Sequence, residues 1–392
     1  MRKRFLLLLI LLVIFQTGVF AQDVVLKYGT PAEAGMSEKI LKAGMTLFEE
    51  AVAADELRGV VVLVARNGII VMHETVGWRD KEQKLPMEKD TMFKMASNTK
   101  PIIAAAVNIL VEERKLAYND NVRKYLPSFD NYRSGYIKIH HLLTHTSGFR
   151  IVPIFYTPLI ERSPEHPDAP TLRLEVDRFG AAGADEPPGT TYSYSNAGFN
   201  TLGALIEIAS GMPLERFLKE RIYLPLEMSD SYNHEIAEKL DGKINRMGVV
   251  YRRRQNEWYA GWKPGDPPDY PFVRASGGMI STAHDYAVFC QTFLNGGIYN
   301  GKRILKEQTV KLMTSPLTAA IYSPEEREKQ NSFYGYGWMV DRNGVFSHTG
   351  SDGTAAYIDP QNKLIVLVFT QSPGGRNPRT RFFTLTQTAV TR

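Results

Sequence analysis

Short runs of β-branched residues at both ends of the chain have the pattern of β-hairpins. In VVVLVARNGIIVMHETVGW, residues 60–78, Asn67-Gly68 joins two such runs and supplies the left-handed backbone of a two-residue turn. A second hairpin is expected in TAAYIDPQNKLIVLVFTQS, residues 354–372, with its turn at Asp359–Asn362. The two patterns predict a sheet built from both ends of the chain.

Helical periodicity dominates between these ends and just before the first hairpin. Ser37 precedes a predicted helix that runs to about Ala53, with Ile40, Leu41, Met45 and Phe48 on one face. Another helix follows Ser97 in MFKMASNTKPIIAAAVNIL, residues 92–110, and is apolar nearly all round, which is typical of a helix buried inside a protein. Segments 151–187 and 261–272 are rich in Pro and Gly and are expected to be loops.

The economical arrangement is α+β. One antiparallel sheet, from roughly residues 37–95 and 335–392, is flanked by helices, and a mainly helical subdomain of roughly residues 96–334 is inserted into it. About 370 residues remain after the first 21, which is enough to bury the core of one large domain or two smaller ones.

The first 21 residues, MRKRFLLLLILLVIFQTGVFA, have a basic start, an apolar stretch and a small-residue end. This pattern predicts a signal peptide cleaved after Ala21, and an uncleaved membrane anchor is the alternative. We therefore expect an exported bacterial protein, periplasmic or secreted, with no stable membrane span after cleavage. Cleavage would lower the formal net charge from +5 to +2, so the basic pI does not indicate nucleic-acid binding.

The single cysteine, Cys290, lies in an apolar helical pattern and is expected in the core. One cysteine forms no disulfide within the chain, so burial of apolar surface must stabilise the fold. No cofactor motif is recognised: Gly335-Tyr336-Gly337 lacks the third glycine and the helix of a dinucleotide site. The sequence leaves the oligomeric state open.

Ser97 and Lys100 stand three positions apart at the start of the buried helix. The simplest interpretation is that Ser97 caps the helix, since serine is a favoured N-cap. One turn of helix also lets the two side chains meet. If their face opens into a cleft, low polarity would favour a neutral lysine able to accept the serine proton.

Two further clusters favour the chemical interpretation. PPGTTYSYSNAGFN contains Tyr194-Ser195-Asn196, and FSHTGSDGTAAYI contains His348-Thr349-Gly350 directly before the C-terminal hairpin. With these motifs in this order, the chain resembles the serine β-lactamase and penicillin-binding protein superfamily, in its class C-like and family VIII esterase branch. HLLTHTSGF (141–149) and ASGGMISTAHD (275–285) are similar to stretches of the same branch, and the resemblance covers roughly residues 35–390. It implies a β-lactamase-like, or transpeptidase-like, fold.

The resemblance also implies roles for the motif residues. Ser97 would be the acyl-accepting nucleophile, with Lys100 as its proton partner. Tyr194 would pass the proton to the leaving group, and Asn196 would orient the substrate. Because Lys100 and Tyr194 would titrate together, the residues alone do not say which of them is the base.

The remaining roles fall on the third motif. His348, Thr349 and Gly350 would contact substrate, and the backbone N–H groups of Ser97 and Ser351 would form the oxyanion hole. Members of the superfamily that bind a carboxylate usually have lysine at the position of His348. A mostly neutral imidazole offers a hydrogen bond but little charge, which favours an esterase or peptidase over an efficient penicillinase.

Two other kinds of site are disfavoured. His141 and His145 stand four apart, as zinc ligands do on a helix, but Leu142 and Leu143 occupy the place of a metalloprotease glutamate, so no metal is expected. We interpret His145 and Ser147 instead as parts of a structural loop. There is no Gly-x-Ser-x-Gly motif of an α/β-hydrolase.

The sequence thus predicts an exported serine hydrolase that forms an acyl-enzyme at Ser97 and acts on ester or amide bonds of a small-molecule or peptide substrate. A β-lactamase proper, and a penicillin-binding sensor of cell-wall peptides with little turnover, are the alternatives. A lipid- or partner-binding scaffold would need a wide apolar patch, which the pattern does not show. The aromatic segment 257–272 is expected either to form a wall of the substrate site or simply to pack.

Overall fold

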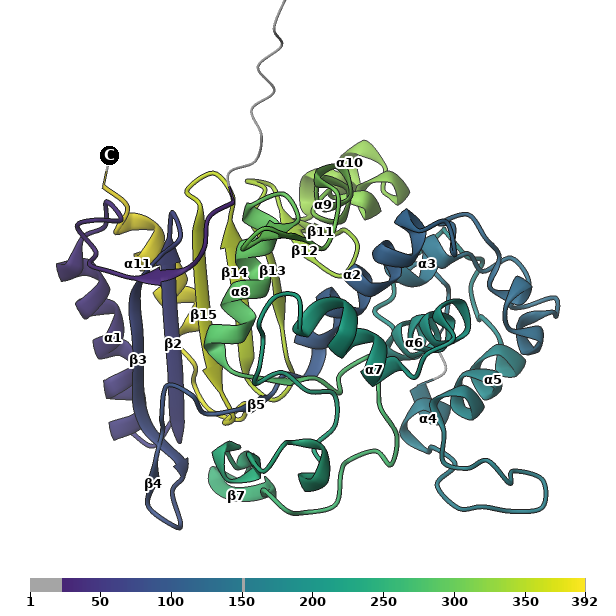
Figure 1. Cartoon of the computed structure of the whole chain (residues 1–392), viewed down its shortest axis with the longest axis horizontal. Coiled ribbons are helices and arrows are strands. Elements are labelled where there is room, and N and C mark those ends of the chain that lie inside the picture. Colours follow the sequence, from purple (N-terminus) through teal and green to yellow (C-terminus); the bar gives the residue numbers. More distant parts are fainter. Residues whose placement is uncertain (1–22, 150–151, 392) are drawn as a thin grey trace, which may run out of the picture.

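A central sheet organises the computed structural model, which describes residues 23–149 and 152–391. Among these residues the sheet has nine strands in the order β1-β3-β2-β15-β14-β13-β12-β11, with β4 paired to β3 (Figure 1). The strands are β1 (Lys27–Tyr28), β2 (Gly59–Arg66), β3 (Ile69–Asp80), β4 (Leu85–Pro86), β11 (Ser332–Tyr334), β12 (Met339–Asp341), β13 (Phe346–Thr349), β14 (Thr354–Asp359) and β15 (Leu364–Thr370).

Both predicted hairpins are present, and they pair with each other. β2 and β3 turn at Asn67 and Gly68, whose φ angles of 53° and 79° lie in the left-handed region. β14 and β15 turn after Asp359, whose Oδ1 accepts backbone N–H groups from Gln361 and Asn362. Antiparallel pairing of β15 with β2 then joins the two ends of the chain. The prediction of a sheet from both termini is confirmed, but β1 pairs with β3 in parallel, so the sheet is mixed.

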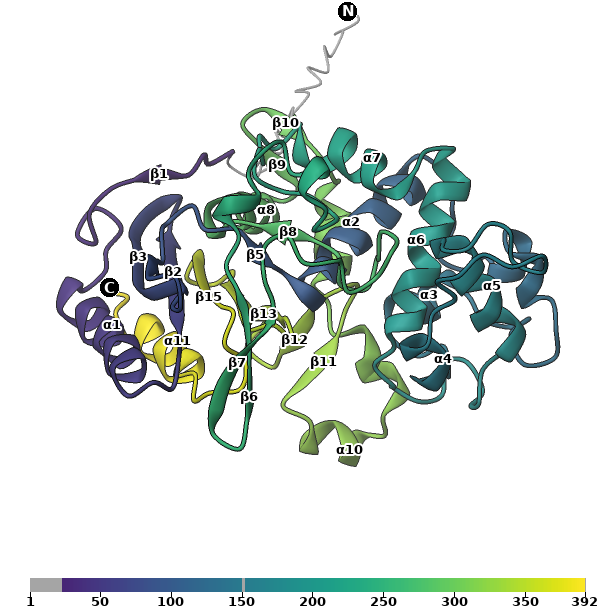
Figure 2. The ribbon, with the colours of Figure 1, turned by 90° about the horizontal axis from the view of Figure 1, so that it is seen from below.

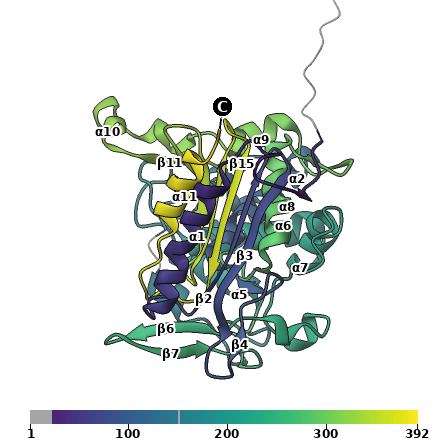
Figure 3. The same ribbon diagram turned by 90° about the vertical axis from the view of Figure 1, so that its left-hand side faces the viewer.

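The side chains of β2 alternate between two cores. Val60, Val62 and Val64 belong to a cluster under α1 (Glu38–Ala53) and α11 (Arg379–Thr388), which lie side by side on one face of the sheet (Figure 3). Ser37 caps α1 as predicted, its Oγ accepting the N–H of Ile40. The other residues of β2, Val61, Leu63 and Ala65, point into the larger core on the opposite face, as the two-residue period of a strand requires.

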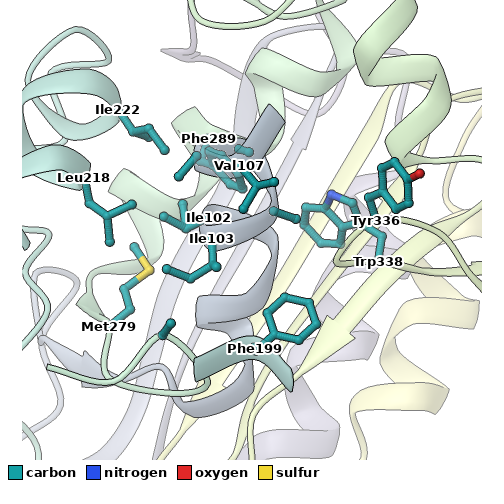
Figure 4. Close-up of a cluster of buried hydrophobic side chains, with 14 of the residues drawn as sticks. Ile102, Ile103, Val107, Phe199, Leu218, Ile222, Met279, Phe289, Tyr336 and Trp338 are labelled. Atoms are coloured by element: carbon teal, nitrogen blue, oxygen red, sulfur yellow. The ribbon is translucent and has the colours of Figure 1, made fainter. Parts of the chain in front are cut away.

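That larger core surrounds α2 (Thr99–Glu112), in which every residue from 99 to 110 is buried. Figure 4 shows Ile102, Ile103 and Val107 of this helix among side chains from the helical part on one side and Trp338 on the other. α8 (Ala283–Leu294), which carries the buried Cys290, packs on strands β2 and β15 of the sheet and belongs to the same core as α2. The prediction of a helix buried on all sides is confirmed.

The other helices are α3 (Ile139–Leu143), α4 (Val152–Tyr156), α5 (Leu172–Ala182), α6 (Asn196–Ser210), α7 (Leu214–Leu218), α9 (Glu307–Met313) and α10 (Pro324–Lys329). Short helical turns are η1 (Ala96–Asn98), η2 (Val122–Lys124), η3 (Pro127–Phe129), η4 (Lys219–Tyr223), η5 (Ala237–Lys239), η6 (Ile244–Arg246) and η7 (Leu317–Ile321). Three two-stranded sheets complete the fold: β5 (Phe93–Lys94) with β8 (Ile280–Ser281), β6 (Val250–Arg254) with β7 (Glu257–Trp262), and β9 (Ile298–Tyr299) with β10 (Lys302–Arg303).

Two segments expected to be loops contain regular structure. Within 151–187, Thr171 caps α5, and Leu172, Val176 and Phe179 of that helix are buried. Their helical spacing was masked by the prolines that precede them. Within 261–272, the first two residues end strand β7, which belongs to a hairpin that lies apart from the central sheet (Figure 2).

The aromatic side chains of that hairpin pack against the protein. Trp262 is buried with Lys94 Nζ 4.7 Å from its ring centroid, and Trp258 donates its Nε1–H to the carbonyl of Asp55. These contacts favour packing over a substrate wall for the two tryptophans. The predicted signal peptide lies outside the described residues, and within them we find no helix with the length and apolar character needed to cross a bilayer.

Replacing Phe48 by alanine is expected to lower the free energy of unfolding by about 3–5 kcal/mol, the usual cost of removing a buried aromatic ring. Phe48 is fully buried, and its ring centroid lies 5.1 Å from that of Phe382, where α1 crosses α11. Urea denaturation measures the change. Phe383→Ala, on α11 next to Phe382 but only half-buried, is the matched control and should cost clearly less.

Candidate active site

Ser97 lies on a tight turn, η1, immediately before α2. The preceding residue, Ala96, has a φ of 46°, a left-handed conformation that costs energy in any residue with a Cβ. The cap position of α2 is occupied by Asn98, which makes no capping bond through its side chain. Ser97 Oγ instead lies 3.0 Å from Lys100 Nζ, within hydrogen-bond distance, so the capping interpretation of Ser97 does not hold.

Hydrogen bonds from distant parts of the chain hold this turn in place. Asn98 Nδ2 donates to Thr354 Oγ1 at 2.9 Å, and Thr354 Oγ1 donates to the carbonyl of Met95 at 3.0 Å. From α8, the hydroxyl of Tyr286 donates to the carbonyl of Asn98 at 2.9 Å. The strain at Ala96 therefore persists because strand β14 and helix α8 both fix the residues around it.

Lys100 is fully buried and has three partners. Besides Ser97, its Nζ contacts Asn196 Oδ1 at 2.8 Å and the carbonyl of Ser276 at 2.7 Å. Within the described part of the chain, no carboxylate oxygen lies within 4.0 Å of this amine. Burial, with a smaller contribution from the positive charge of Arg274, holds the pKa of Lys100 well below its ordinary value.

The partners of Lys100 suit a neutral amine. A neutral amine has two N–H donors and one lone pair, and Asn196 Oδ1 and the Ser276 carbonyl accept the two hydrogens. The lone pair is then available to the hydroxyl proton of Ser97. After proton transfer, the third N–H of the ammonium points back to Ser97 Oγ, so every polar atom has a partner before and after the transfer.

Tyr194 and Asn196 stand at the start of α6. Ser195 caps this helix by accepting the N–H of Gly198 at 3.1 Å, which explains why the Tyr-Ser-Asn motif precedes an apolar helical run. The centroid of the Tyr194 ring lies 4.7 Å from Lys100 Nζ. Although 43 % of Tyr194 is exposed, desolvation raises the pKa of its phenol above the ordinary value, and a hydrogen bond with Ser97 partly offsets that shift.

His348 is buried at the end of β13, and both of its ring nitrogens have protein partners. Nδ1 donates to the carbonyl of Thr349 at 3.0 Å, so Nε2 accepts from the hydroxyl of Tyr334 at 3.1 Å. Burial, together with the nearby Lys100, lowers the pKa of His348 to about 3, so the imidazole is neutral at pH 7. A direct hydrogen bond from His348 to a substrate would require it to give up one of these partners.

Gly350 brings β13 against the turn that carries Ser97. A Cβ built on Gly350 would lie 2.3 Å from the carbonyl oxygen of Met95 and 2.5 Å from Thr354 Oγ1, so only glycine fits. The neighbours Thr349 and Ser351 are exposed. The residues proposed from the three motifs thus meet at one place, with Tyr194, Thr349 and Ser351 toward solvent and Lys100 behind them.

Sequence reasoning missed residues that support this arrangement. Ser276 supplies the carbonyl for Lys100, and its own N–H is held by Asn200 Oδ1 at 2.9 Å. The stretch 275–285 is similar to one in related proteins, but a backbone acceptor leaves no signature in side-chain types. His145, interpreted as part of a structural loop, packs directly on Tyr194 with ring centroids 4.3 Å apart. Residues 23–149 and 152–391 contain no cluster of three His, Cys, Asp or Glu side chains suited to a metal ion.

Comparison with known proteins places the chain among hydrolases of this fold. A putative D-alanyl-D-alanine carboxypeptidase of Escherichia coli K12 is 26% identical over 413 residues, covering 95% of this chain and 91% of that protein. EstCE1, a hydrolase with promiscuous acyltransferase activity, superposes with a TM-score of 0.72 at 22% identity, covering 90% and 99% of the two chains. The D-amino acid amidase of Ochrobactrum anthropi SV3 gives 0.69 at 22% identity, covering 89% and 98%.

The family model described as Beta-lactamase matches residues 45–389. This range includes Lys100, the turn that carries Ser97, and strand β13 beside that turn. On this match and the fold, the chain is a member of the Beta-lactamase family of serine hydrolases.

Proposed function

We propose that this protein is an exported hydrolase that cleaves ester or amide bonds through an acyl-enzyme on Ser97. The observation that carries the proposal is the set of partners around Lys100, a buried amine with two fixed acceptors and its lone pair left for the serine proton. A serine hydroxyl is a weak nucleophile unless a base lies beside it. Lys100 can act as that base, since its Nζ lies 3.0 Å from Ser97 Oγ.

In the acylation step, Ser97 Oγ forms a bond to the substrate carbonyl carbon while its proton passes to Lys100 Nζ. The carbonyl oxygen becomes an oxyanion. When the tetrahedral intermediate collapses, the bond to the leaving group breaks, and the phenol of Tyr194, which its raised pKa keeps protonated, donates its proton to the leaving group. The Lys100 ammonium then returns the serine proton to Tyr194, so both residues regain their starting states. Water then attacks the acyl-enzyme and releases the acid, restoring the Ser97 hydroxyl.

The oxyanion would be bound by the backbone N–H groups of Ser97 and Ser351. Support comes from Gly350, whose close approach to Met95 brings the residue after it next to the nucleophile turn. Preorganised backbone donors stabilise charge that develops in the transition state, because they need no reorganisation when it appears.

We base the substrate class on the neutral state of His348. His348, at the position where carboxylate-binding relatives carry lysine, is neutral and already partnered. We therefore favour a simple ester or an amide of a D-amino acid over an efficiently hydrolysed β-lactam. The names of similar proteins, a carboxypeptidase, an amidase and a hydrolase with acyltransferase activity, support this range of substrates. Export rests on the N-terminal segment of the sequence alone.

Replacing Ser97 by alanine should lower turnover at least about a thousandfold and abolish covalent labelling by a fluorophosphonate, because no other group supplies the attacking atom. The wild type should turn over a chromogenic short-chain ester. A stable fluorescent-penicillin adduct without turnover of any ester, β-lactam or D-amino-acid peptide would identify a sensor instead. Near-normal activity in Ser97→Ala would refute the proposal, provided that circular dichroism shows an intact fold.

Lys100 and Tyr194 should both take part in moving the Ser97 proton to the leaving group. Lys100→Ala and Tyr194→Phe are each expected to lower kcat at least about a hundredfold, while the double variant should lose much less than the product of the two losses. A double-mutant cycle on kcat measures this. Full additivity would show that the two residues do not share the task.

The acid limb of the pH–rate profile should report Lys100. Only the neutral amine accepts the serine proton, so the rate rises with pH through the lowered pKa of Lys100 and is already high at pH values where an ordinary lysine is fully charged. The measurement is kcat/KM of an uncharged ester between pH 4 and pH 10, all at one ionic strength. A rate that rises only near the ordinary lysine pKa would contradict a neutral Lys100.

Gly350→Ala should slow labelling of Ser97 by about tenfold or more, because the added Cβ pushes β13 away from the nucleophile turn and misplaces Ser351. Gly277→Ala is the matched control: its Cβ would meet Ala96 at an ordinary distance of 3.5 Å. Equal labelling rates in the two variants would mean that the approach at Gly350 does not shape the site.

A further inference from the structure

His145 is completely buried, with an unusual backbone and side chain for a residue of a surface loop. Its φ of 57° lies in the left-handed region, which histidine tolerates less well than glycine. A turn encloses it, since the N–H of Thr146 donates to the carbonyl of His141 at 2.8 Å, and Gly148, three residues on, also has a left-handed φ of 76°. None of the proposed chemical steps uses this histidine. Backbone strain at a buried residue often marks a functional role, and the contacts of His145 indicate what that role is.

The residues on both sides of Tyr194 are bonded to His145. The N–H of Ser193 donates to the backbone carbonyl of His145 at 2.8 Å. The N–H of Ser195 donates to His145 Nδ1 at 2.9 Å. Between these two bonds, the ring of Tyr194 lies on the imidazole, with a centroid separation of 4.3 Å and an angle of 33° between the planes. His145 therefore contacts Tyr194 and its two neighbours at three separate points.

The same contacts determine the tautomer and charge of the imidazole. Because Nδ1 accepts from a backbone N–H, the proton of the neutral ring is on Nε2. Nε2 has no hydrogen-bond partner among the described residues, and the ring is surrounded by aromatic side chains, with the centroids of Phe199 and Tyr334 at 4.9 and 4.6 Å. Burial and the neighbouring Lys100 and His348 hold its pKa well below the ordinary value, so His145 adds no charge beside the amine.

We propose that His145 is a positioning residue: it holds the phenol of Tyr194 over Lys100 through its Nδ1 acceptor, its carbonyl and its ring. This inference rests on the roles proposed above for Ser97 and Tyr194. Tyr194 needs such contacts to keep its orientation. It is 43 % exposed and lies in the segment between a turn and α6, where its side chain has little packing on the outer side. A proton donor that is free to swing loses much of its effectiveness, since small misplacements cost large factors in rate.

Two substitutions separate the contributions of the ring and the acceptor. His145→Asn places an amide oxygen near the position of Nδ1 but removes the ring. Asparagine also tolerates the left-handed backbone conformation at this position. His145→Phe keeps a ring on Tyr194 but leaves the N–H of Ser195 without its acceptor. His141→Asn is the matched control, since His141 belongs to the same stretch and its Nδ1 accepts a backbone N–H from Lys138 at 3.1 Å.

Each change is made in the wild type and in Tyr194→Phe, with thermal unfolding recorded for every variant. The readouts are kcat and KM for a chromogenic ester and the rate of fluorophosphonate labelling at Ser97. In the wild type, both His145 variants should lower kcat and labelling by about tenfold with KM changed less than about twofold. In Tyr194→Phe the same changes should cost less than about twofold, because the hydroxyl that His145 positions is already gone.

Equal losses in the two backgrounds would overturn the inference, because His145 would then act independently of Tyr194. Unchanged rates in both His145 variants, or an equal loss in His141→Asn, would overturn it as well. If His145→Phe does not fold, His145→Asn alone decides. Failure of the wild type to be labelled at Ser97 would overturn the proposed function together with this inference, whereas a labelled wild type with additive losses would remove only the role of His145.

Discussion

Burial of the Lys100 amine without a carboxylate partner is the constraint on which the rest of the site depends. An ammonium group in a protein interior is costly unless an anion balances it, so this lysine lowers its pKa and takes up the neutral form. Neutrality is useful only if the lone pair faces an acidic proton. The fold meets that condition by giving the two N–H groups fixed acceptors, Asn196 Oδ1 and the Ser276 carbonyl, and leaving the lone pair to Ser97.

Those partners come from parts of the chain that meet only in the folded protein. Asn196 begins α6, and Ser276 stands in the segment before β8, where its N–H is held by Asn200. The sheet closes the arrangement, since β13 reaches the serine turn through Gly350 and β14 holds it through Thr354. The left-handed backbone at Ala96 is maintained by such contacts, because β14 and α8, which hold the residues around it, would have to move before it could relax.

The two buried histidines near the site illustrate how charge is kept away from the amine. His348 gives its Nδ1–H to the carbonyl of Thr349, and His145 uses Nδ1 as an acceptor, so the two rings are held in opposite tautomers. Both have pKa values lowered by burial and by Lys100. A protonated imidazole at either position would repel the Lys100 ammonium and so raise the free-energy cost of transferring the Ser97 proton to Lys100.

Local sequence determined much of this protein. The turn at Asn67-Gly68, the cap at Ser37 and the all-apolar helix after Ser97 each depend on neighbouring residues, and all three are present in the structure. Ser97 and Lys100 were recognisable because one helical turn separates them, whereas Tyr194 and His348 were recognised through the resemblance of their motifs to those of the serine β-lactamase superfamily. They mark a candidate site whether or not its surroundings are known.

Only the tertiary structure decided what surrounds them. A backbone carbonyl such as that of Ser276 has no signature in residue type, and the partners of both nitrogens of His348 depend on which strand lies beside β13. Likewise, β1 joins the sheet in parallel because its contacts with the distant strand β3 outweigh weak local preferences. Spacing along the chain specifies which groups are available, whereas burial and long-range pairing specify their protonation, orientation and partners.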